Sequence, residues 1–235
     1  MGQIVAHLGD SLQQELGSCL PIFLERLKNE ITRLTAVKAL ISIASSPLRI
    51  DLSCILSGRM PVLSSFLRKN QRALKLSTLL LLDTMVKNYS TSLALDTLSP
   101  VLAELPPLVS ETDLHIAQLT LNLLTSISVN HRQAIPTIQK TVLPEVLKLA
   151  ESPLLQGAAL TAMLDFFKSV VSAGVPGLAH SDLLALLVNP VLGGTIQLGQ
   201  PQQERGRVGG KPHQQSAGLQ PHLQPACYWR DRPWS

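Results

Sequence analysis

The stretch Pro61-Val-Leu-Ser-Ser-Phe-Leu-Arg-Lys-Asn70-Gln-Arg-Ala-Leu-Lys-Leu-Ser-Thr-Leu-Leu-Leu-Leu-Asp-Thr-Met-Val86 contains two segments with the periodicity of amphipathic helices. The first carries a narrow apolar stripe and the second a wider one: Leu63, Phe66 and Leu67, then Leu74, Leu76, Leu79, Leu80, Leu82 and Val86. Asn70 lies between them, and its side-chain oxygen can accept from a free N–H at a helix start. The stretch therefore predicts a helical hairpin that turns at Asn70.

The same hairpin pattern recurs along the chain at intervals of about 40 residues. Four residues of the N-capping type are 41, 40 and 42 residues apart: Asn29, Asn70, Ser110 and Ser152. Four prolines upstream of them are 40, 39 and 44 residues apart: Pro21, Pro61, Pro100 and Pro144. A helix pair with this period is typical of HEAT and armadillo arrays. We therefore predict an all-α solenoid, with an ordinary helical bundle of similar loops as the alternative.

The expected solenoid has about four helix pairs, at residues 11–28 with 30–45, 51–69 with 71–88, 94–109 with 111–129, and 134–150 with 153–173. A single helix is expected at each end, at residues 3–8 and 181–189. The helix at 94–109 should end or bend early at Pro106-Pro107. These elements make up a predicted solenoid domain of residues 1–191.

Residues 192–235 form a second predicted region, a disordered Gly/Pro/Gln-rich tail. Residues 193–235 hold 7 Gly, 5 Pro and 8 Gln and show no helical apolar period. Such a composition cannot bury enough apolar surface to offset the entropy of ordering. Five of the Lys and Arg residues lie here against two carboxylates, so the tail carries +3 of the net charge of +4 and the repeats carry +1. Nearly neutral repeats argue against a phosphate-binding track and hence against a nucleic-acid partner.

The sequence contains no arrangement typical of catalysis, cofactor binding or metal binding. Cys19, Cys54 and Cys227 are scattered singly, which is typical of free thiols in a reducing compartment. The histidines, such as His115 and His131, have no second ligand at metal spacing. The chain has no nucleophile elbow, no phosphate-binding glycine loop and no HExxH motif. We therefore predict a protein that is not an enzyme and has no cofactor.

The candidate site is a surface for a protein partner. In HEAT arrays the second helices of the pairs usually line the concave face. The expected contact strip has three parts. The first is a basic cluster of Arg68, Lys69, Arg72 and Lys75, and the second is its counterparts one repeat earlier, Arg33 and Lys38. The third is a polar stripe of His115, Gln118, Asn122 and Thr125. The alternative is that these residues form a solvated face that keeps a leucine-rich array soluble.

Two further expectations concern partners. The apolar run at 76–86 is shorter than the roughly 20 residues of a membrane span and is interrupted by Asp83, so no membrane partner is expected.

Repeat arrays normally end in polar capping units, and this chain places apolar residues near each end: Ile4, Val5 and Leu8, then Leu183, Leu184 and Leu187. We therefore predict marginal stability or self-association through such ends. An armadillo-like nuclear-transport or transcription-associated adaptor is a second functional hypothesis, but residues 1–192 contain no tryptophan for the ladder that a transport adaptor needs.

Four segments resemble the central repeats of the cullin-associated, neddylation-dissociated proteins: Ile22-Phe-Leu-Glu-Arg-Leu-Lys-Asn-Glu-Ile-Thr-Arg-Leu-Thr35, Phe66-Leu-Arg-Lys-Asn-Gln-Arg-Ala-Leu-Lys-Leu76, Glu104-Leu-Pro-Pro-Leu108 and Ser152-Pro-Leu-Leu-Gln-Gly-Ala-Ala-Leu-Thr-Ala-Met-Leu-Asp-Phe-Phe167. The resemblance covers about residues 1–191 and is somewhat greater to the second of two vertebrate paralogues. It implies a long HEAT solenoid that wraps unneddylated cullin–RING scaffolds and exchanges their substrate receptors, in the cytoplasm and nucleus. It also implies that this chain is a truncated or alternatively spliced form without the family's terminal contact regions.

Overall fold

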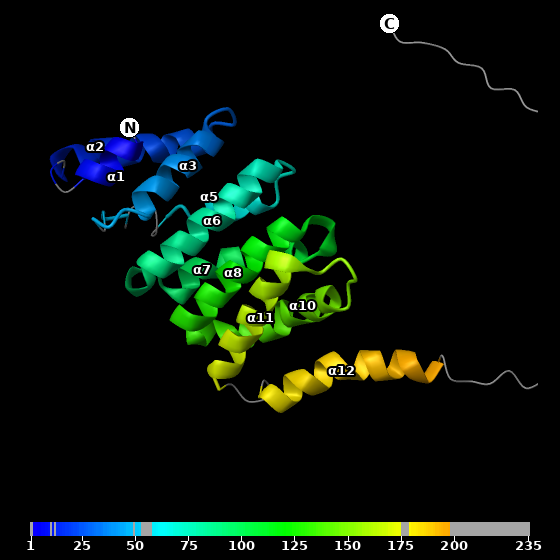
Figure 1. Ribbon diagram of the computed structural model, residues 1–235. Coiled ribbons are helices and arrows are strands. Elements are labelled where there is room, and N and C mark those ends of the chain that lie inside the picture. Colours follow the sequence, from blue (N-terminus) through cyan, green and yellow to red (C-terminus); the bar gives the residue numbers. More distant parts are fainter. Residues whose placement is uncertain are drawn as a thin grey trace, which may run out of the picture.

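The computed structural model (Figure 1) describes residues 2–9, 11, 13–48, 50–52, 58–174 and 179–197, and these contain helices and no strand. The α-helices are α1 Gly2–Leu8, α2 Gln13–Lys28, α3 Arg33–Ala44, α5 Met60–Leu67, α6 Arg72–Asn88, α7 Leu95–Leu102, α8 Leu114–Asn130, α9 Ile135–Thr141, α10 Leu143–Ala150, α11 Gly157–Ser172 and α12 His180–Gln197. Short 3₁₀ turns lie between them: η1 Ser90–Ser92, η2 Pro106–Leu108, η3 Glu111–Asp113 and η4 Arg132–Ala134.

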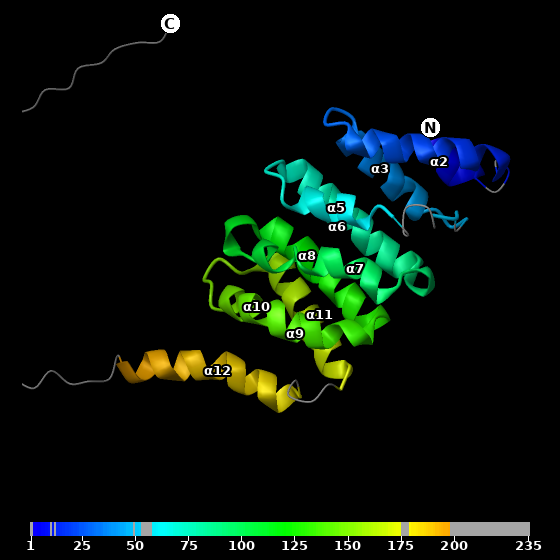
Figure 2. The same cartoon turned by 180° about the vertical axis from the view of Figure 1, so that it is seen from behind.

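The helices form a two-layer array, which confirms the predicted α-solenoid. The second helices of the pairs, α3, α6, α8 and α11, pack side by side in that order. The first helices lie on the other side of the stack, where α2 packs on α3 and α5 packs on α6 and α7. Figure 2 shows the same stack from behind. Helix α1 packs on α3, so it takes the place of a second helix at that end.

The core repeats every 42 residues along the second helices. Two sets of equivalent residues are all buried: Val37, Leu79, Leu121 and Met163, and Leu40, Leu82, Leu124 and Phe166. These side chains belong to one continuous apolar cluster that extends from Val5 to Leu183. The strict interval means that each pair contributes the same positions to the core. It also defines which surface residues are equivalent from one pair to the next.

The four predicted caps lie in the turns before the second helices, and this corrects their assigned role. Helices α3, α6 and α11 have Thr32, Gln71 and Gln156 at the N-cap instead. Ser110 caps the 3₁₀ turn η3, and Asp113 caps α8. Three of the predicted caps accept from the backbone N–H two residues later: Asn29 from Ile31 at 2.9 Å, Ser110 from Thr112 at 3.3 Å, and Ser152 from Leu154 at 3.2 Å. Short polar side chains favour such turns as well as helix caps, so their spacing was informative although their role differed.

The first helices of the third and fourth pairs are shorter than predicted. The described part of the second pair's first helix is α5, because residues 53–57 lie outside the described residues. Helix α7 ends at Leu102, before the two prolines that were expected to end it. In the fourth pair, the expected helix is divided at Val142 into α9 and α10, and Pro144 lies in the first turn of α10. A proline there lacks an N–H that the helix start does not need.

The two ends differ from expectation in two respects. Val5 and Leu183 are buried and therefore have partners, whereas Ile4, Leu8 and Leu184 are more than half exposed. Helix α12 continues through Pro190 to Gln197, six residues beyond the predicted end of the solenoid domain. A proline inside a helix removes one backbone donor, and it can bend the helix without ending it. Residues 198–235 lie outside the described residues, so the disordered tail stays a prediction.

Candidate partner-binding surface

The outward side of the second helices carries equivalent positions with different chemistry. The row Lys38, Leu80, Asn122 and Leu164 follows the 42-residue interval across α3, α6, α8 and α11. Lys38 is exposed, Leu80 and Leu164 are 43% and 58% exposed, and Asn122 is half-buried. One cation, one amide and two leucines suit a protein partner better than a polyanion, because a phosphate track needs a row of cations.

The basic cluster lies at the edge of the array where the helix pairs turn, and the next pair supplies carboxylates to it. The Nη1 atom of Arg68 is 2.9 Å from Oε1 of Glu104. The guanidinium of Arg72 makes two hydrogen bonds to Asp113, from Nε to Oδ2 at 2.5 Å and from Nη2 to Oδ1 at 3.1 Å. Two of the four predicted contact cations therefore hold neighbouring pairs together.

Hydrogen bonding between Arg72 and Asp113 affects both pKa values. The hydrogen bond from Arg72 lowers the pKa of the Asp113 carboxyl below its usual range, and the backbone N–H groups of Ile116 and His115 add to the effect. The same hydrogen bond raises the pKa of Arg72. Both side chains therefore stay charged together and neutralise each other, which leaves less of the positive field that the cluster was expected to present.

The other two cations of the cluster are free among the described residues. Lys69 is exposed in the turn before α6, and Lys75 is half-buried on α6. Neither makes an ion pair within the part of the chain that the structure describes. They are the members of the cluster whose charge is open to a partner.

Arg33 is not open to a partner. The residue is only 8% exposed, and its guanidinium lies 5.9 Å from the centre of the Phe66 ring. Its Nε donates to the backbone oxygen of Glu30 at 3.3 Å, and Nη2 pairs with the Glu30 carboxylate. Arg33 and Lys75 are 42 residues apart and so occupy equivalent positions, but Arg33 packs between helix pairs. Its proposed contact with a partner would require this side chain to move.

The polar stripe on α8 is placed where it was expected, with His115 exposed and Gln118, Asn122 and Thr125 half-buried. The first residue of the stripe, His115, and Arg72 of the basic cluster both donate hydrogen bonds to the carboxylate of Asp113. The backbone N–H of His115 donates to Oδ1 of Asp113 at 3.1 Å, and Arg72 binds the same oxygen. The structure thus brings Arg72 and the start of the stripe together, while Gln118 lies farther along α8.

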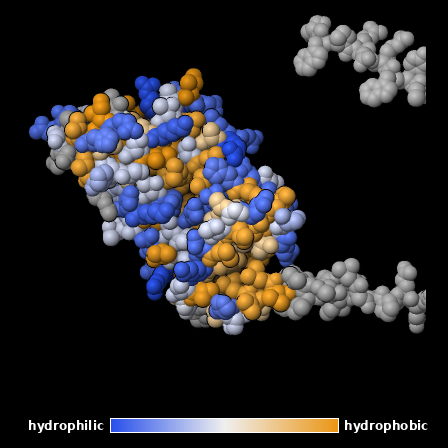
Figure 3. All heavy atoms as spheres, viewed as in Figure 1, coloured by the Kyte–Doolittle hydropathy of each residue, from blue (hydrophilic) through white to orange (hydrophobic). Residues whose placement is uncertain are grey.

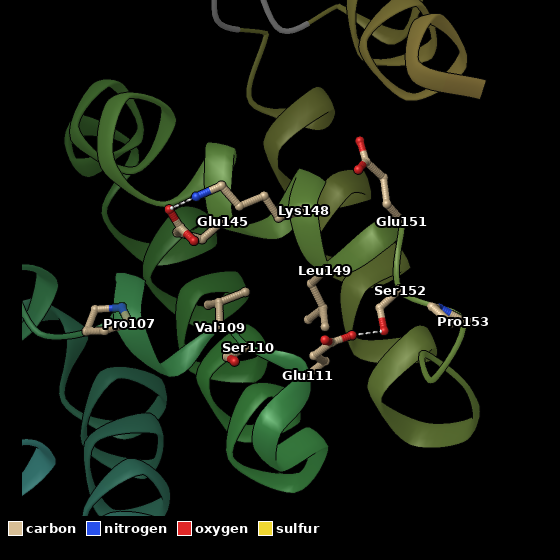
Figure 4. Close-up of a pocket in the computed structure, with 10 residues that line it drawn as sticks. All are labelled: Pro107, Val109, Ser110, Glu111, Glu145, Lys148, Leu149, Glu151, Ser152 and Pro153. Atoms are coloured by element: carbon tan, nitrogen blue, oxygen red, sulfur yellow. Dashed lines mark hydrogen bonds and ion pairs between the residues drawn. The ribbon is translucent and has the colours of Figure 1, made fainter. Parts of the chain in front are cut away.

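An acidic groove lies at the same edge, between the third and fourth pairs (Figure 4). It has a volume of about 480 Å³, with Val109 and Leu149 among its apolar lining and three glutamates around it: Glu111, Glu145 and Glu151. Lys148 pairs with Glu145 at 2.8 Å, and Ser152 donates to Glu111. Sequence reasoning missed this groove because Glu111 belongs to one helix pair and Glu145 and Glu151 belong to the next. The 42-residue interval between Ser110 and Ser152 was the available signal that the two turns are neighbours.

The described residues offer little for other kinds of chemistry. They contain no group of three or more His, Cys, Asp or Glu side chains that could hold a metal ion. The Nε2 atom of His131 is buried without a hydrogen-bond partner, and this burial lowers the pKa of His131. None of the described helices is both long enough and apolar enough to cross a membrane. The expectations of no catalysis and no cofactor stay predictions.

Known proteins share the sequence of these repeats. The chain is 50% identical to cullin-associated NEDD8-dissociated protein 1 of Drosophila melanogaster over 194 residues, and the aligned region covers 83% of this chain and 16% of that protein. It is 46% identical to cullin-associated NEDD8-dissociated protein 2 of Rattus norvegicus over 191 residues, and the aligned region covers 81% of this chain and 15% of that protein. The corresponding protein 1 of Dictyostelium discoideum is 42% identical over 193 residues. No protein-family model matches the chain.

These relatives define the family but not the paralogue. Proteins numbered 1 and 2 are both similar to the chain, so its assignment to the second vertebrate paralogue stays a prediction. The chain spans only 15–16% of the length of the first two relatives. The aligned regions cover about four fifths of this chain. By sequence, the chain belongs to the family of cullin-associated NEDD8-dissociated proteins.

Proposed function

We propose that this chain is a non-catalytic protein-binding scaffold whose partner is a cullin–RING assembly. The observation that carries the proposal is the 50% identity over 194 residues to a protein named for its association with cullins. The mixed chemistry of the outward row on the second helices supports a protein partner. We do not expect nucleic acid or membranes to compete for this surface, because a phosphate track needs many aligned cations.

Within that surface, we assign the basic contact to Lys69 and Lys75. Arg68 and Arg72 form ion pairs with carboxylates of the next helix pair, those of Glu104 and Asp113, so their charge is largely neutralised within the array. Reversing all four charges would put acidic side chains beside these carboxylates and disturb the junction. Reversing only the two lysines tests binding without breaking an ion pair between the described residues.

The chain should bind a cullin–RING assembly weakly and leave its substrate receptor in place. A long solenoid binds through many contacts, and each contact makes the next effectively intramolecular. A chain that spans 15–16% of its relatives' length has only part of such a surface. We propose that these repeats take part in the assembly of SCF-type ubiquitin ligases and in receptor exchange as one part of such a binding surface.

Calorimetric titration against a purified, unneddylated cullin–RING complex tests the proposal. The variant Lys69→Glu/Lys75→Glu should bind at least about tenfold more weakly, a change of about 1.4 kcal/mol. The control variant is Arg26→Glu/Lys140→Glu, which reverses two exposed cations on the first helices α2 and α9. It should bind like the original chain. No binding by the original chain would reject the proposed partner, and equal binding by all three would show that the basic cluster is a solvated face.

We further propose that the chain acts in the cytoplasm and nucleus, as the family resemblance implies. Fluorescence microscopy of the tagged chain would test this location. Exclusion of the chain from either compartment would contradict it.

A further inference from the structure

The acidic groove between the third and fourth helix pairs has apolar surface from both pairs. Val109 and Leu149 are each 3% exposed and line its inner part, and Pro107 and Pro153 are exposed beside them. A side chain that enters the groove therefore contacts apolar residues of two neighbouring repeats. An aromatic side chain suits such a place, because it buries a large apolar area with few rotatable bonds.

The groove also carries negative charge that the array does not neutralise. Three carboxylates and one ammonium group line it, those of Glu111, Glu145, Glu151 and Lys148. Lys148 pairs with Glu145, and the Ser152 hydroxyl donates to Glu111 without cancelling its charge. Within the part of the chain that the structure describes, Glu111 and Glu151 make no ion pair. Both charges are therefore open to a cationic ligand.

The carboxylates are spread around the groove and do not converge on one point (Figure 4). A bound metal ion needs ligands that converge on it. Two cationic side chains on one segment fit this arrangement better, and arginine can bind a carboxylate through two parallel hydrogen bonds. The groove therefore suits a short peptide segment that combines arginine with aromatic residues.

The chain contains such a segment among the residues outside the described structure, Tyr228-Trp-Arg-Asp-Arg-Pro-Trp234. Its two arginines, Arg230 and Arg232, are two residues apart, with Asp231 between them. Pro233 favours an extended backbone at the residue before it. In an extended segment alternate side chains share one side, so both arginines would face the groove with the first and last aromatic residues, and Asp231 would face away.

We propose that residues 228–234 bind in the acidic groove of the same chain. Arg230 and Arg232 pair with the open carboxylates of Glu111 and Glu151, and an aromatic side chain packs on the apolar inner part. The segment then joins the third and fourth helix pairs at their turns. Because it is tethered, it competes at a high effective concentration with any basic segment of another protein.

The segment is able to reach the groove. Helix α12 contacts α10, which lines the groove, and Figure 3 shows the beginning of α12 against the end of the array. With 18 residues, α12 places its last residue, Gln197, within about 27 Å of its first. In both ribbon views α12 runs toward the side on which the chain turns from α10 into α11. Residues 198–227 can span up to roughly 100 Å, which is more than this return requires.

A second basic segment of the tail is the main competitor for the groove. Residues 204–211 contain Arg205, Arg207 and Lys211 against Glu204, so they carry more net charge than residues 228–234. They contain no aromatic residue, however, and cannot fill the apolar inner part of the groove in the same way. Charge alone would favour the first segment, whereas charge combined with apolar contact favours the second.

Tryptophan fluorescence of the full 235-residue chain tests the proposal, because Trp229 and Trp234 are its two tryptophans and both lie in the segment. In the original chain their emission should be blue-shifted and poorly quenched by acrylamide. The variant Arg230→Glu/Arg232→Glu should lower the equilibrium constant for docking at least about tenfold and expose them. The matched control is Arg205→Glu/Arg207→Glu, which makes the same charge change in the same tail and should leave quenching unchanged.

The groove is tested from its own side by Glu111→Gln/Glu151→Gln. Glutamine removes the charge but still accepts from Ser152, so the tryptophans should become exposed while circular dichroism shows the same helicity. An exchange of charges provides the rescue. Glu111→Arg/Glu151→Arg combined with Arg230→Glu/Arg232→Glu should restore the protection that each pair of changes removes alone.

Four outcomes would overturn the proposal. Tryptophans that are as accessible in the original chain as in Arg230→Glu/Arg232→Glu would show that the segment does not dock. Equal exposure in Arg205→Glu/Arg207→Glu would show a general attraction of the basic tail. No rescue by the exchanged charges would show that the groove changes act through the helix junction. Protection that increases with chain concentration would place the segment in the groove of a second copy.

Discussion

The carboxylate of Asp113 binds the guanidinium of Arg72 across the junction between the second and third helix pairs, at 2.5 and 3.1 Å. The same carboxylate caps α8, because its Oδ1 accepts from the backbone N–H groups of His115 and Ile116, both at 3.1 Å. One side chain thus starts a helix and joins it to the preceding pair. A fork-like guanidinium on a carboxylate fixes orientation as well as charge, so this pair helps to set the angle between neighbouring repeats.

The variant Asp113→Ala should lower the free energy of unfolding by about 1 kcal/mol, because it removes the cap of α8. Asp113→Asn is the matched control. It keeps a capping oxygen but loses the negative charge that Arg72 binds, so its loss should be smaller. Urea unfolding followed by circular dichroism measures both. Equal losses in the two variants would mean that the ion pair matters and the cap does not.

Stability should fall in mild acid because of His131. Burial lowers the pKa of this imidazole below its ordinary value of 6.5, so the unfolded chain takes up the proton at a higher pH than the folded chain does. Between the two pKa values the unfolded state binds more protons, and the free energy of unfolding decreases as the pH falls. The full stability is present above 6.5, and the loss levels off below the pKa of the folded state.

Thermal unfolding at about pH 7.5 and pH 5.5, which lie on either side of the ordinary histidine pKa, measures this effect. The variant His131→Phe should make the melting temperature less dependent on pH, since it removes the buried group that must be protonated. His115→Gln, at an exposed histidine of the same region, serves as the control and should keep the pH dependence of the original chain. An unchanged pH dependence in His131→Phe would contradict the assignment.

The sequence allowed the array to be predicted because its signals are local and repeated. Apolar spacing identified the helices, and the polar turn residues at Asn29, Ser110 and Ser152 marked the interval, although they stabilise turns rather than cap the α-helices. The end of α12 was misplaced: a helix was predicted at residues 181–189, and the observed helix passes through Pro190 to Gln197. A local pattern cannot tell whether neighbouring turns of the chain compensate for one lost hydrogen bond.

The candidate surface was less predictable because its chemistry depends on contacts between pairs. Arg68, Lys69, Arg72 and Lys75 look alike in sequence, yet two of them meet carboxylates 36 and 41 residues away. Such contacts depend on how one pair is rotated against the next, and apolar periodicity does not specify that rotation to the precision of a hydrogen bond. The burial of Arg33 against Phe66 has the same origin. Knowing the 42-residue interval in advance would have indicated which turns meet.

Replacement of Arg33 should affect stability more than binding. Its guanidinium lies over the Phe66 ring and is almost fully buried, so Arg33→Ala should cost roughly 1–2 kcal/mol in unfolding free energy. Arg33→Lys should restore only part of this, since lysine lacks the planar group that stacks. Arg68→Ala, which breaks an ion pair with a 65% exposed side chain, is the comparison and should cost clearly less. A larger loss in Arg68→Ala would contradict the buried role of Arg33.

A buried hydrogen bond between Asp83 and Ser126 should hold α6 against α8. Asp83 is 8% exposed, and its carboxylate binds Ser126 Oγ at 2.5 Å and Lys87 Nζ at 2.6 Å. Ser126→Ala leaves a lone pair of this carboxylate unsatisfied between the helices, which should cost about 1–3 kcal/mol. Ser128→Ala is the matched control, because Ser128 is also buried but its hydroxyl donates only to the Leu124 backbone oxygen of its own helix.

The double variant Asp83→Asn/Ser126→Ala separates the interaction from the effects of the single changes. If the two side chains act together, the double variant should lose less stability than the sum of the single variants, because the second change removes a partner that is already lost. Strict additivity would show that the bond contributes nothing across the junction. The carboxylate of Asp83 is held on one side by Lys87 of its own helix and on the other by Ser126 of the next. In a Lys87→Met background this carboxylate is free to reorient, so the coupling energy between Asp83 and Ser126 should be smaller. Urea unfolding of the full set gives the coupling energy and its dependence on Lys87.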